Sequence, residues 1–424
     1  NQQSVAVKKT IRNKKSKSEK QTVIDTGETF LTLEKQKLFL DRFRTWVWTD
    51  PERKARLESI YEERYTCIRT RHYDGSFLEL PGLSKTISLY PYQKNAVARI
   101  LFSPNTLLAH DVGSGKTYIM IAAGMELRRL NLSKKNMYVV PNNLTRQWKT
   151  IYDAMYPAAE IKCIEPKNFT PKKRQAVLED IRNNDYDAVI IAYSCFSQIP
   201  ISIDCQLEIL AREKSKLVNK QKEGDEKKTK KLFEEMHKLE NQLQEKILEK
   251  NSNREEQGIS FDELGITRLF VDEAHNFKNV PINTKIDHVM GISRTGSAKC
   301  RDMMDKVRIV QHHNAGKGVV LATGTPITNS ITDIYIMQQY LQSGELEILD
   351  LESFDSWVGM FAEKTANFEI DVDTTTYRMA TRFAKFHNIP ELTTMLASFA
   401  DFHQTDEMSE IPQHDGYQDI VISK

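Results

Sequence analysis

The sequence LLAHDVGSGKT, residues Leu107–Thr117, joins an apolar run to a glycine-containing turn. After it the sequence predicts a helix over residues 118–130. Backbone N–H groups in such a turn, placed at a helix N-terminus, form an anion site. Lys116 adds a mobile positive charge for β- and γ-phosphates, and the Thr117 hydroxyl is a hard oxygen ligand for Mg²⁺. The stretch therefore predicts a nucleotide-phosphate site made of Gly113, Ser114, Gly115, Lys116 and Thr117.

The stretch departs at one position from the phosphate-loop pattern GxxxxGK followed by Ser or Thr. His110 stands where that pattern has its first glycine, whereas Gly113 and Gly115 remain in the turn. By itself, GSGKT has a second interpretation, a glycine turn that happens to precede a helix. Motifs further along the chain favour the phosphate site.

Length and composition describe a soluble globular protein. The 424 residues correspond to two or three domains, and contents of 40% apolar and 28% charged residues are ordinary for such a chain. A net charge of +2 says nothing about partners. Residues 8–20 form a basic run with few apolar residues, so we expect residues 1–30 to be a disordered basic tail. A solvated tail is the simpler interpretation of this run, and contact with phosphate is the other.

The cysteines argue against a zinc site. They number five, Cys67, Cys163, Cys195, Cys205 and Cys300, without metal-ligand spacing, which indicates a reducing compartment. We find no apolar run of about 18 residues and no signal peptide, so the sequence predicts a cytoplasmic protein without a membrane partner. A chain that begins at Asn1 without methionine suggests a piece of a longer protein.

Residues 31–85 are predicted to be an N-terminal helical region. Helix is expected over 32–71, with Trp46, Trp48, Leu57, Ile60 and Tyr61 on its apolar face, and a Gly/Pro-bounded link follows at 74–82. Tyr92 and Gln93 then lead into an amphipathic helix that reaches residue 100. A glutamine just upstream of a phosphate loop can read adenine, because its amide both donates and accepts. By itself Gln93 would be a helix-surface residue.

Apolar runs followed by polar loops predict the central strands of a parallel sheet. Their alternation with helices predicts a doubly wound α/β lobe, over residues 86–204 and 258–345, that binds ligands at the carboxyl ends of its strands. The four runs are residues 137–140, 188–192, 269–271 and 318–322.

The composition shifts to Lys, Glu and Gln over residues 205–257. Leucines and other apolar residues recur there at spacings of three and four, in two sets separated by Gly224-Asp225. This pattern predicts an inserted antiparallel helical hairpin, a coiled coil that stands off the lobe. A solvated strut is the default interpretation, and a binding site for DNA or a protein partner is the sharper one.

The segment Leu269–His275, LFVDEAH, places two carboxylates directly after a buried strand. Asp272 is suited to hold Mg²⁺, and Glu273 is suited to polarise the attacking water. A solvated Asp-Glu loop is common, but a DEAH sequence at a strand end downstream of GKT is not. Further on, Thr323 and Thr325 follow another strand, and we expect them to hydrogen-bond His275 and Glu273. Such bonds would couple the phosphate site to the nucleic-acid-facing loops.

In this order the segments resemble the first motor lobe of superfamily-two helicases, most closely the Swi/Snf-like branch. The surrounding sequence is similar to large helicase-like proteins of bacterial mobile elements and phages. The resemblance spans residues 89–424, apart from the hairpin, and implies a RecA-like doubly wound parallel sheet. The segments are YQ (Tyr92-Gln93), GSGKT (Gly113–Thr117), PNNLTRQW (Pro141–Trp148), DEAH (Asp272–His275) and TGTPITNS (Thr323–Ser330).

The resemblance implies ATP and Mg²⁺ as cofactors and assigns roles to residues. Lys116, Asp272 and Glu273 would be catalytic, Thr117 and Asp272 would hold Mg²⁺, and Gln93 would read adenine. His275, Thr323 and Thr325 would couple the sites. DNA would be held mainly through its phosphates, on duplex or on one strand. The DNA-contacting residues would be Pro141, Asn142, Thr145, Arg146, Gln147, Tyr193 and Ser194.

The QxxGRxxR segment of the second lobe is missing from this sequence. We expect residues 346–424 to be a helical extension, packed through residues such as Trp357 and Phe399, that leads to a second motor lobe through a strand at 418–422. Without the arginines of that lobe, hydrolysis would fall by ~10³ or more. We also find no methylase loop of the NPPY type and no nuclease motif.

The sequence thus predicts the ATP-binding lobe of a DNA-dependent translocase that uses Mg-ATP to move along DNA. A nucleotide-switched scaffold, which recruits a partner through the hairpin, is one alternative. An RNA helicase is another, because DEAH occurs in those enzymes as well.

Overall fold

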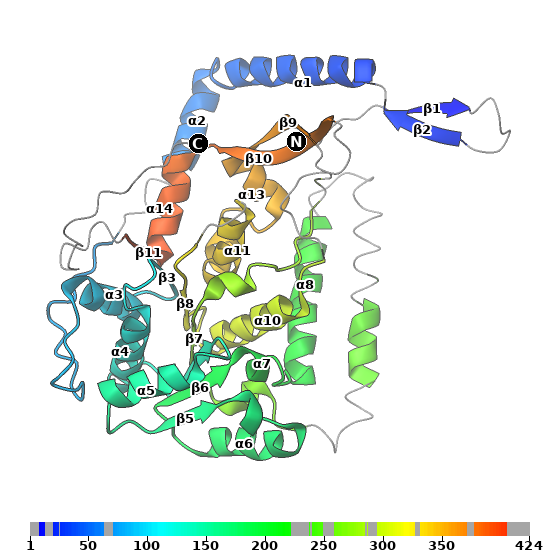
Figure 1. Ribbon diagram of the computed structural model, residues 1–424. Coiled ribbons are helices and arrows are strands. Elements are labelled where there is room, and N and C mark those ends of the chain that lie inside the picture. Colours follow the sequence, from blue (N-terminus) through cyan, green and yellow to red (C-terminus); the bar gives the residue numbers. More distant parts are fainter. Residues whose placement is uncertain are drawn as a thin grey trace.

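The computed structural model describes residues 8–12, 20–24, 26–62, 71–221, 237, 240–248, 258–284, 286, 295–326, 331–370 and 377–404. A seven-stranded sheet lies at its centre, in the order β11-β3-β8-β7-β4-β6-β5 (Figure 1). All neighbouring strands in it run parallel. The strands are β3 (Thr106–His110), β4 (Asn136–Val140), β5 (Ile161–Ile164), β6 (Ala188–Ala192), β7 (Arg268–Val271), β8 (Val319–Ala322) and β11 (Ala400–His403).

Alternate residues of each central strand enter two different cores. In β4, Met137 and Val139 belong to one apolar cluster, and Tyr138 and Val140 belong to the other. One cluster is covered by α3 (Pro91–Phe102), α4 (Lys116–Arg129) and α5 (Thr145–Met155). The other packs against α6 (Pro171–Asn183), α7 (Tyr193–Phe196), η3 (Phe261–Leu264), η4 (Ala274–Phe277), α10 (Ala298–His313), α11 (Thr332–Leu341), α12 (Ser343–Ile348), α13 (Phe354–Phe361) and α14 (Ile389–Phe399). A short helix, η2 (Pro166–Asn168), follows β5.

The predicted doubly wound α/β fold is therefore confirmed, and so are its four predicted strands, which are β4, β6, β7 and β8. Each of the four is buried over three or more consecutive residues, as expected for a parallel sheet covered on both faces. The edge strands β5 and β11 were not predicted. The sequence of β5, IKCI, lacks the continuous apolar run of the central strands, and three of its four residues are only partly buried.

The prediction of a helical extension over 346–424 is wrong in part. Helices α13 and α14 are present, but β9 (Ala362–Ile370) and β10 (Tyr377–Phe386) form an antiparallel pair, and β11 adds a parallel strand to the main sheet beside β3. Threonine and aromatic residues in β9 and β10 favour strands over helix. Trp357 and Phe399 are buried as predicted. The strand expected at 418–422 lies outside the described residues.

At the N-terminus the prediction of disorder over 1–30 is wrong for the described strands. β1 (Lys8–Arg12) and β2 (Lys20–Ile24) pair antiparallel, with Lys8 opposite Ile24. Their β-branched residues favour a strand despite the basic charge. The helical region begins with α1 (Thr26–Val47) and continues in α2 (Pro51–Tyr61). Its expected apolar face does not pack into a core, because Trp46 is 53% and Trp48 is 57% exposed.

Part of the expected hairpin is described. Helix α8 (Ile203–Gln221) lies beside the helical residues 240–248, and Lys214 Nζ is 2.8 Å from Glu240 Oε1 (Figure 1). The turn between them lies outside the described residues, so the hairpin remains a proposal.

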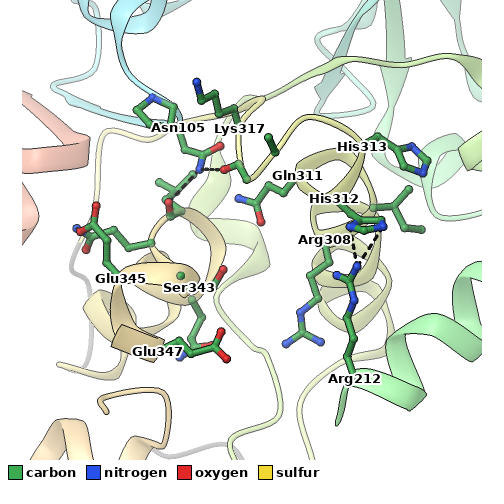
Figure 2. Close-up of a pocket in the computed structure, with 18 of the residues that line it drawn as sticks. Asn105, Arg212, Arg308, Gln311, His312, His313, Lys317, Ser343, Glu345 and Glu347 are labelled. Carbon is green, nitrogen blue, oxygen red and sulfur yellow. Dashed lines mark hydrogen bonds between the residues drawn. The ribbon is translucent and has the colours of Figure 1, made fainter. Parts of the chain in front are cut away.

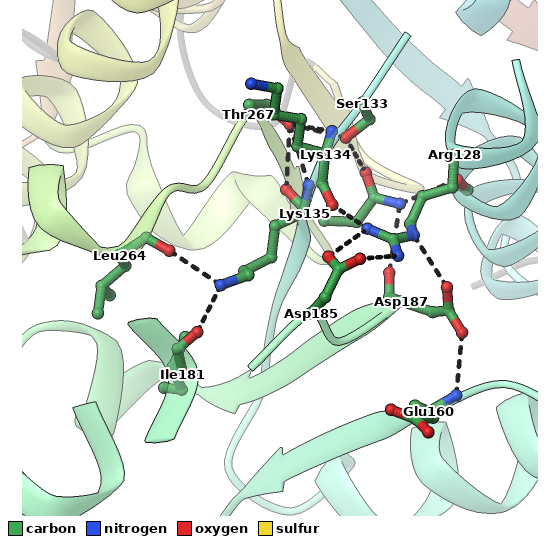
Figure 3. A network of polar contacts seen from close by, with 12 residues as sticks. Arg128, Ser133, Lys134, Lys135, Glu160, Ile181, Asp185, Asp187, Leu264 and Thr267 are labelled. Atoms are coloured by element: carbon green, nitrogen blue, oxygen red, sulfur yellow. Dashed lines mark hydrogen bonds and ion pairs between the residues drawn. The ribbon is translucent and has the colours of Figure 1, made fainter. Parts of the chain in front are cut away.

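A polar network fastens the loops at the amino ends of the strands (Figure 3). Arg128 pairs with Asp185 at 3.1 Å and with Asp187 at 2.9 Å, just before β6. Before β7, the Thr267 hydroxyl accepts hydrogen bonds from the backbone N–H groups of Lys134 (2.9 Å) and Lys135 (3.2 Å). These contacts hold the amino edge of the sheet together, and the chain's motifs follow the strands at the opposite, carboxyl edge.

One close approach between α4 and β4 is testable. An added Cβ at Gly124 would overlap the hydroxyl oxygen of Tyr138, a fully buried residue. We therefore expect Gly124→Ala to lower the free energy of unfolding by about 1–3 kcal/mol, the usual cost of overpacking a core. Urea denaturation measures it. Gly344→Ala is the control, because no atom lies within 4 Å of a Cβ there. Equal stability of the two variants would contradict the tight α4–β4 packing.

Candidate active site at the carboxyl edge of the sheet

The glycine turn after β3 is shaped as the sequence predicted. Gly113 (φ 90°) and Gly115 (φ 77°) both adopt left-handed conformations that a side chain would strain. Helix α4 begins at Lys116, and no side chain caps its N-terminus. Its first N–H groups therefore have no side-chain acceptor, as an anion site requires. The buried Ser114 hydroxyl likewise has no hydrogen-bond partner among the described residues.

Lys116 is held by its own loop. Its Nζ donates to the carbonyl oxygens of His110 (2.8 Å) and Asp111 (2.9 Å). Burial lowers the pKa of Lys116, and the nearby carboxylates of Glu273 and Asp272 act in the opposite direction. The ammonium group thus lies within electrostatic reach of the acidic pair, although β8 separates β3 from β7 in the sheet.

Asp272 is a buried carboxylate with two donors. Its Oδ2 accepts a hydrogen bond from Trp148 Nε1 at 3.1 Å, and its Oδ1 accepts one from the Glu273 N–H at 2.9 Å. Burial raises the pKa of Asp272 and the Glu273 carboxylate adds to that rise, while the Trp148 bond opposes it. A cation beside Asp272 would offset both causes of the rise.

Glu273 adopts a left-handed backbone conformation, with φ of 48°. Such strain in a residue with a side chain is a feature of functional sites. The Tyr193 hydroxyl supports this turn, since it donates to the carbonyl oxygens of Asp272 and, at 3.3 Å, of Glu273. The Glu273 carboxylate is one-third exposed and lies 3.2 Å from His275 Nδ1. It is therefore both accessible and oriented.

The turn at Thr323–Thr325 contacts the DEAH segment (Asp272–His275) through His275. His275 Nδ1 lies 3.3 Å from the hydroxyl of Thr323, which is fully buried. Thr325 joins through its backbone, because its N–H donates to Thr323 Oγ1 at 3.1 Å and its carbonyl accepts from Lys278 Nζ at 2.8 Å. The structure thus brings these three residues together with the expected His275–Thr323 contact, but among the described residues neither threonine hydroxyl bonds Glu273.

Gln93 braces the phosphate loop. Its Oε1 accepts from the Tyr90 N–H at 3.0 Å, and its Nε2 donates to the Ser114 carbonyl at 3.1 Å. Tyr92 donates its hydroxyl to the same carbonyl at 2.9 Å, a support that sequence reasoning missed. Beyond these two bonds, the Gln93 amide keeps one N–H and one oxygen lone pair.

The two segments predicted to contact DNA lie against each other. The Ser194 N–H donates to Asn142 Oδ1 at 3.1 Å. Asn142, Arg146 and Gln147 are exposed, Pro141 is half-buried, and Arg146 pairs with Glu165 at 2.8 Å. The Thr145 side chain is buried, and Tyr193 points its hydroxyl at the acidic turn rather than at solvent. The exposed side chains of this surface thus come mainly from the first segment.

A cavity of about 790 Å³ lies at the opposite, amino edge of the sheet. Asn105 and Lys317, just before β3 and β8, line it together with residues of α8, α10 and α12. Figure 2 shows Arg212 of α8 pointing at His312 of α10, 2.6 Å from its Nδ1. This cavity is not part of the carboxyl-edge site. Among the described residues, no cluster of His, Cys, Asp and Glu has the make-up of a metal centre.

A Cβ at Gly115 would overlap the amide nitrogen of Gln93, whereas at Gly265, whose φ is 71°, no atom lies within 4 Å. We expect Gly115→Ala and the control Gly265→Ala to lose a similar ~1–2 kcal/mol of stability to backbone strain. Only Gly115→Ala should also weaken the binding of a fluorescent ATP analogue, by about tenfold, the effect of roughly 1.4 kcal/mol. Unchanged binding would contradict the role of this turn.

Two family models match the chain. A family model described as a probable helicase domain matches residues 101–404, and one for a domain of unknown function (DUF8437) matches residues 1–67. The chain is 21% identical over 357 residues to "Defense against restriction protein B" of Escherichia phage P1. The match covers 73% of this chain and 15% of that protein. This chain thus spans only a small part of the length of that relative.

Two solved structures of a Sulfolobus solfataricus SWI2/SNF2 ATPase core are also similar. The core in complex with dsDNA aligns with a TM-score of 0.41 and 15% identity, over 78% of this chain and 47% of that chain. The core domain aligns with a TM-score of 0.40 and 14% identity, over 79% and 47% of the two chains.

No helix in the described part of the chain has the length and apolar character needed to cross a membrane.

The helicase match includes the phosphate loop, the Asp272-Glu273 pair, the Thr323 turn and β11, and only Gln93 of the predicted ATP-site residues lies outside it. The chain belongs to the family of probable helicase domains.

Proposed function

We propose that this chain is the ATP-binding lobe of a DNA-dependent ATPase, Swi/Snf-like in type, that uses Mg-ATP hydrolysis to move along DNA. The observation that carries the proposal is that the loops after β3 and β7, which bear Lys116 and the Asp272-Glu273 pair, lie at the same edge of the sheet, where the two carboxylates favour the charged form of Lys116. Lys116 reaches that edge from the loop after β3, and the carboxylates reach it from the loop after β7. A positive charge facing two carboxylates is the arrangement that a metal-bound triphosphate requires.

The phosphate loop suits a nucleotide. Its uncapped helix N-terminus and the left-handed Gly113 and Gly115 let backbone N–H groups approach phosphate oxygens. Lys116 would exchange its carbonyl partners for the β- and γ-phosphates, and Thr117 and Asp272 would hold Mg²⁺. When bound, Mg²⁺ neutralises charge on the phosphate oxygens. Gln93 would read adenine from its place beside the loop.

Glu273 is the residue we propose as the base. Its carboxylate is partly exposed and is oriented by His275 at 3.2 Å, so it can accept a proton from the attacking water. His275 in turn lies against Thr323. A change in the position of Glu273 would therefore displace His275 and the turn at Thr323–Thr325. This chain of contacts is the basis of the coupling role that we propose for His275, Thr323 and Thr325.

The DNA contacts are proposed at the strand-end segments. Asn142 and Ser194 join these segments, and Arg146 and Gln147 are exposed beside them, suited to phosphate contacts that position a strand without reading its sequence. Tyr193 would act indirectly, through the turn that holds Asp272 and Glu273. Pro141 and Thr145 would shape the segment.

A nucleotide-switched scaffold is the second candidate. It is favoured by the Lys214–Glu240 pair, which holds the helical residues 240–248 beside α8. The effect of DNA on the ATP hydrolysis rate distinguishes the two candidates, because a motor hydrolyses ATP faster when it is bound to DNA and a switch does not.

We therefore expect duplex DNA to raise the ATP hydrolysis rate of this chain several-fold, and RNA to raise it less. The absolute rate should be low, because no QxxGRxxR segment occurs in this sequence and an arginine finger is worth ~10³–10⁵ in nucleotide hydrolysis. Steady-state phosphate release, with each nucleic acid in turn, measures it. Equal rates with and without DNA would favour the switch, and preference for RNA would favour an RNA helicase.

Two substitutions separate binding from chemistry. Glu273→Gln should lower hydrolysis by ~10²–10⁴, the contribution of a positioned base, and leave ATP binding unchanged. Lys116→Ala should weaken ATP binding itself, as measured by titration with a fluorescent analogue. Glu160→Gln, an exposed carboxylate near the amino edge, is the control and should change neither. Hydrolysis that persists in Glu273→Gln would show that the base is another group.

A further inference from the structure

A small cavity lies on the far side of the phosphate loop from the acidic pair. It measures about 220 Å³ and is lined by residues of α3, the end of β3 and β11. Pockets for drug-sized ligands are larger, about 300–1,000 Å³. The cavity therefore suits a small ion or molecule.

Its lining carries more basic than acidic side chains. It has two arginines, Arg71 and Arg99, and three histidines, His72, His110 and His403, whereas among its described residues Asp401 supplies the only carboxylate. Both oxygens of Asp401 are already engaged. Its Oδ2 lies 2.8 Å from His110 Nε2, and its Oδ1 lies 3.5 Å from Arg99 Nη1. The lining therefore favours an anion.

Two buried nitrogen atoms have no partner. Arg99 is 6% exposed and His110 is 1% exposed, and neither Arg99 Nε nor His110 Nδ1 has a hydrogen-bond partner among the described residues. Such groups are costly to leave unsatisfied. The Arg99 Nε–H needs an acceptor. The bond to Asp401 favours the His110 tautomer with its proton on Nε2, which leaves Nδ1 as an acceptor that needs a donor.

We propose that this cavity binds a free hydrogen phosphate ion. One oxygen accepts the Arg99 Nε–H, and the protonated oxygen donates to His110 Nδ1. Asp401 orients both residues from β11. A phosphodiester has no O–H group and brings two bulky substituents, so a nucleic-acid backbone does not meet these requirements. Sulfate carries no proton at neutral pH and satisfies only Arg99.

The site extends beyond the proposed function. His110 connects it to the phosphate loop, because the His110 carbonyl holds Lys116 Nζ at 2.8 Å. Hydrolysis of ATP would supply inorganic phosphate next to this site, but binding of the ion does not depend on hydrolysis. The two ideas can therefore fail separately.

The test is equilibrium dialysis of the whole chain with radiolabelled inorganic phosphate, without nucleotide. Arg99→Lys keeps the charge and removes the Nε–H, so we expect phosphate affinity to fall about tenfold or more, as for loss of a hydrogen bond to a charged group. Lys116→Ala removes phosphate held at the phosphate loop, and the Arg99-dependent binding should persist in it. Lys134→Gln, which removes an exposed positive charge at the amino edge, is the matched control. Sulfate and AMP should compete weakly.

A second measurement does not rely on a variant. In the wild-type protein, addition of phosphate should shift the imidazole ¹⁵N resonances of His110. Three outcomes would overturn the proposal: no phosphate binding, so that water alone fills the cavity; binding lost in Lys116→Ala and kept in Arg99→Lys, so that the ion occupies only the phosphate loop; or equal binding of sulfate, so that His110 does not accept a proton.

Discussion

The candidate site depends on one constraint: the carboxyl edge of the parallel sheet brings the Lys116 ammonium within electrostatic reach of the Asp272 and Glu273 carboxylates. These charges are brought together by the parallel sheet, because parallel strands deliver their following loops to one edge. Burial opposes charge on both Lys116 and Asp272, so each is stabilised by groups that the fold places beside it. The apolar cores on both faces of the sheet thus hold a small polar edge in place.

The phosphate loop is braced from two directions. Tyr92 and Gln93 of α3 both bond the Ser114 carbonyl, while the Asp111 N–H donates to the carbonyl of His403 at 3.1 Å. The ring of His403 also stacks on Tyr92, with centroids 4.1 Å apart. Strand β11, which closes the described chain, thus contacts the loop directly. Movement of either element would therefore move the loop whose carbonyl groups hold Lys116.

The central strands and the phosphate turn could be predicted because each has a local signature. Buried parallel strands are continuous apolar runs, and a glycine turn before a helix is visible in sequence. Contacts between distant residues have no such signature. Nothing local marks Asp401 as the partner of His110, or Tyr193 as the support of Asp272. The short strand β11 has no continuous apolar run in its sequence, and its Phe402 is exposed. The basic charge of residues 8–20 favoured a prediction of disorder, although the β-branched residues of β1 and β2 favour strands.

The central claim is that one nucleotide and one divalent ion occupy the space between Lys116 and the acidic pair. A crystal structure grown with Mn²⁺ and a non-hydrolysable ATP analogue tests it directly, since manganese is located by its anomalous scattering. We predict a single strong peak between the Thr117 hydroxyl and the Asp272 carboxylate, with the terminal phosphate beside Lys116. A nucleotide found elsewhere, for example in the cavity between α8 and α10, would contradict the account.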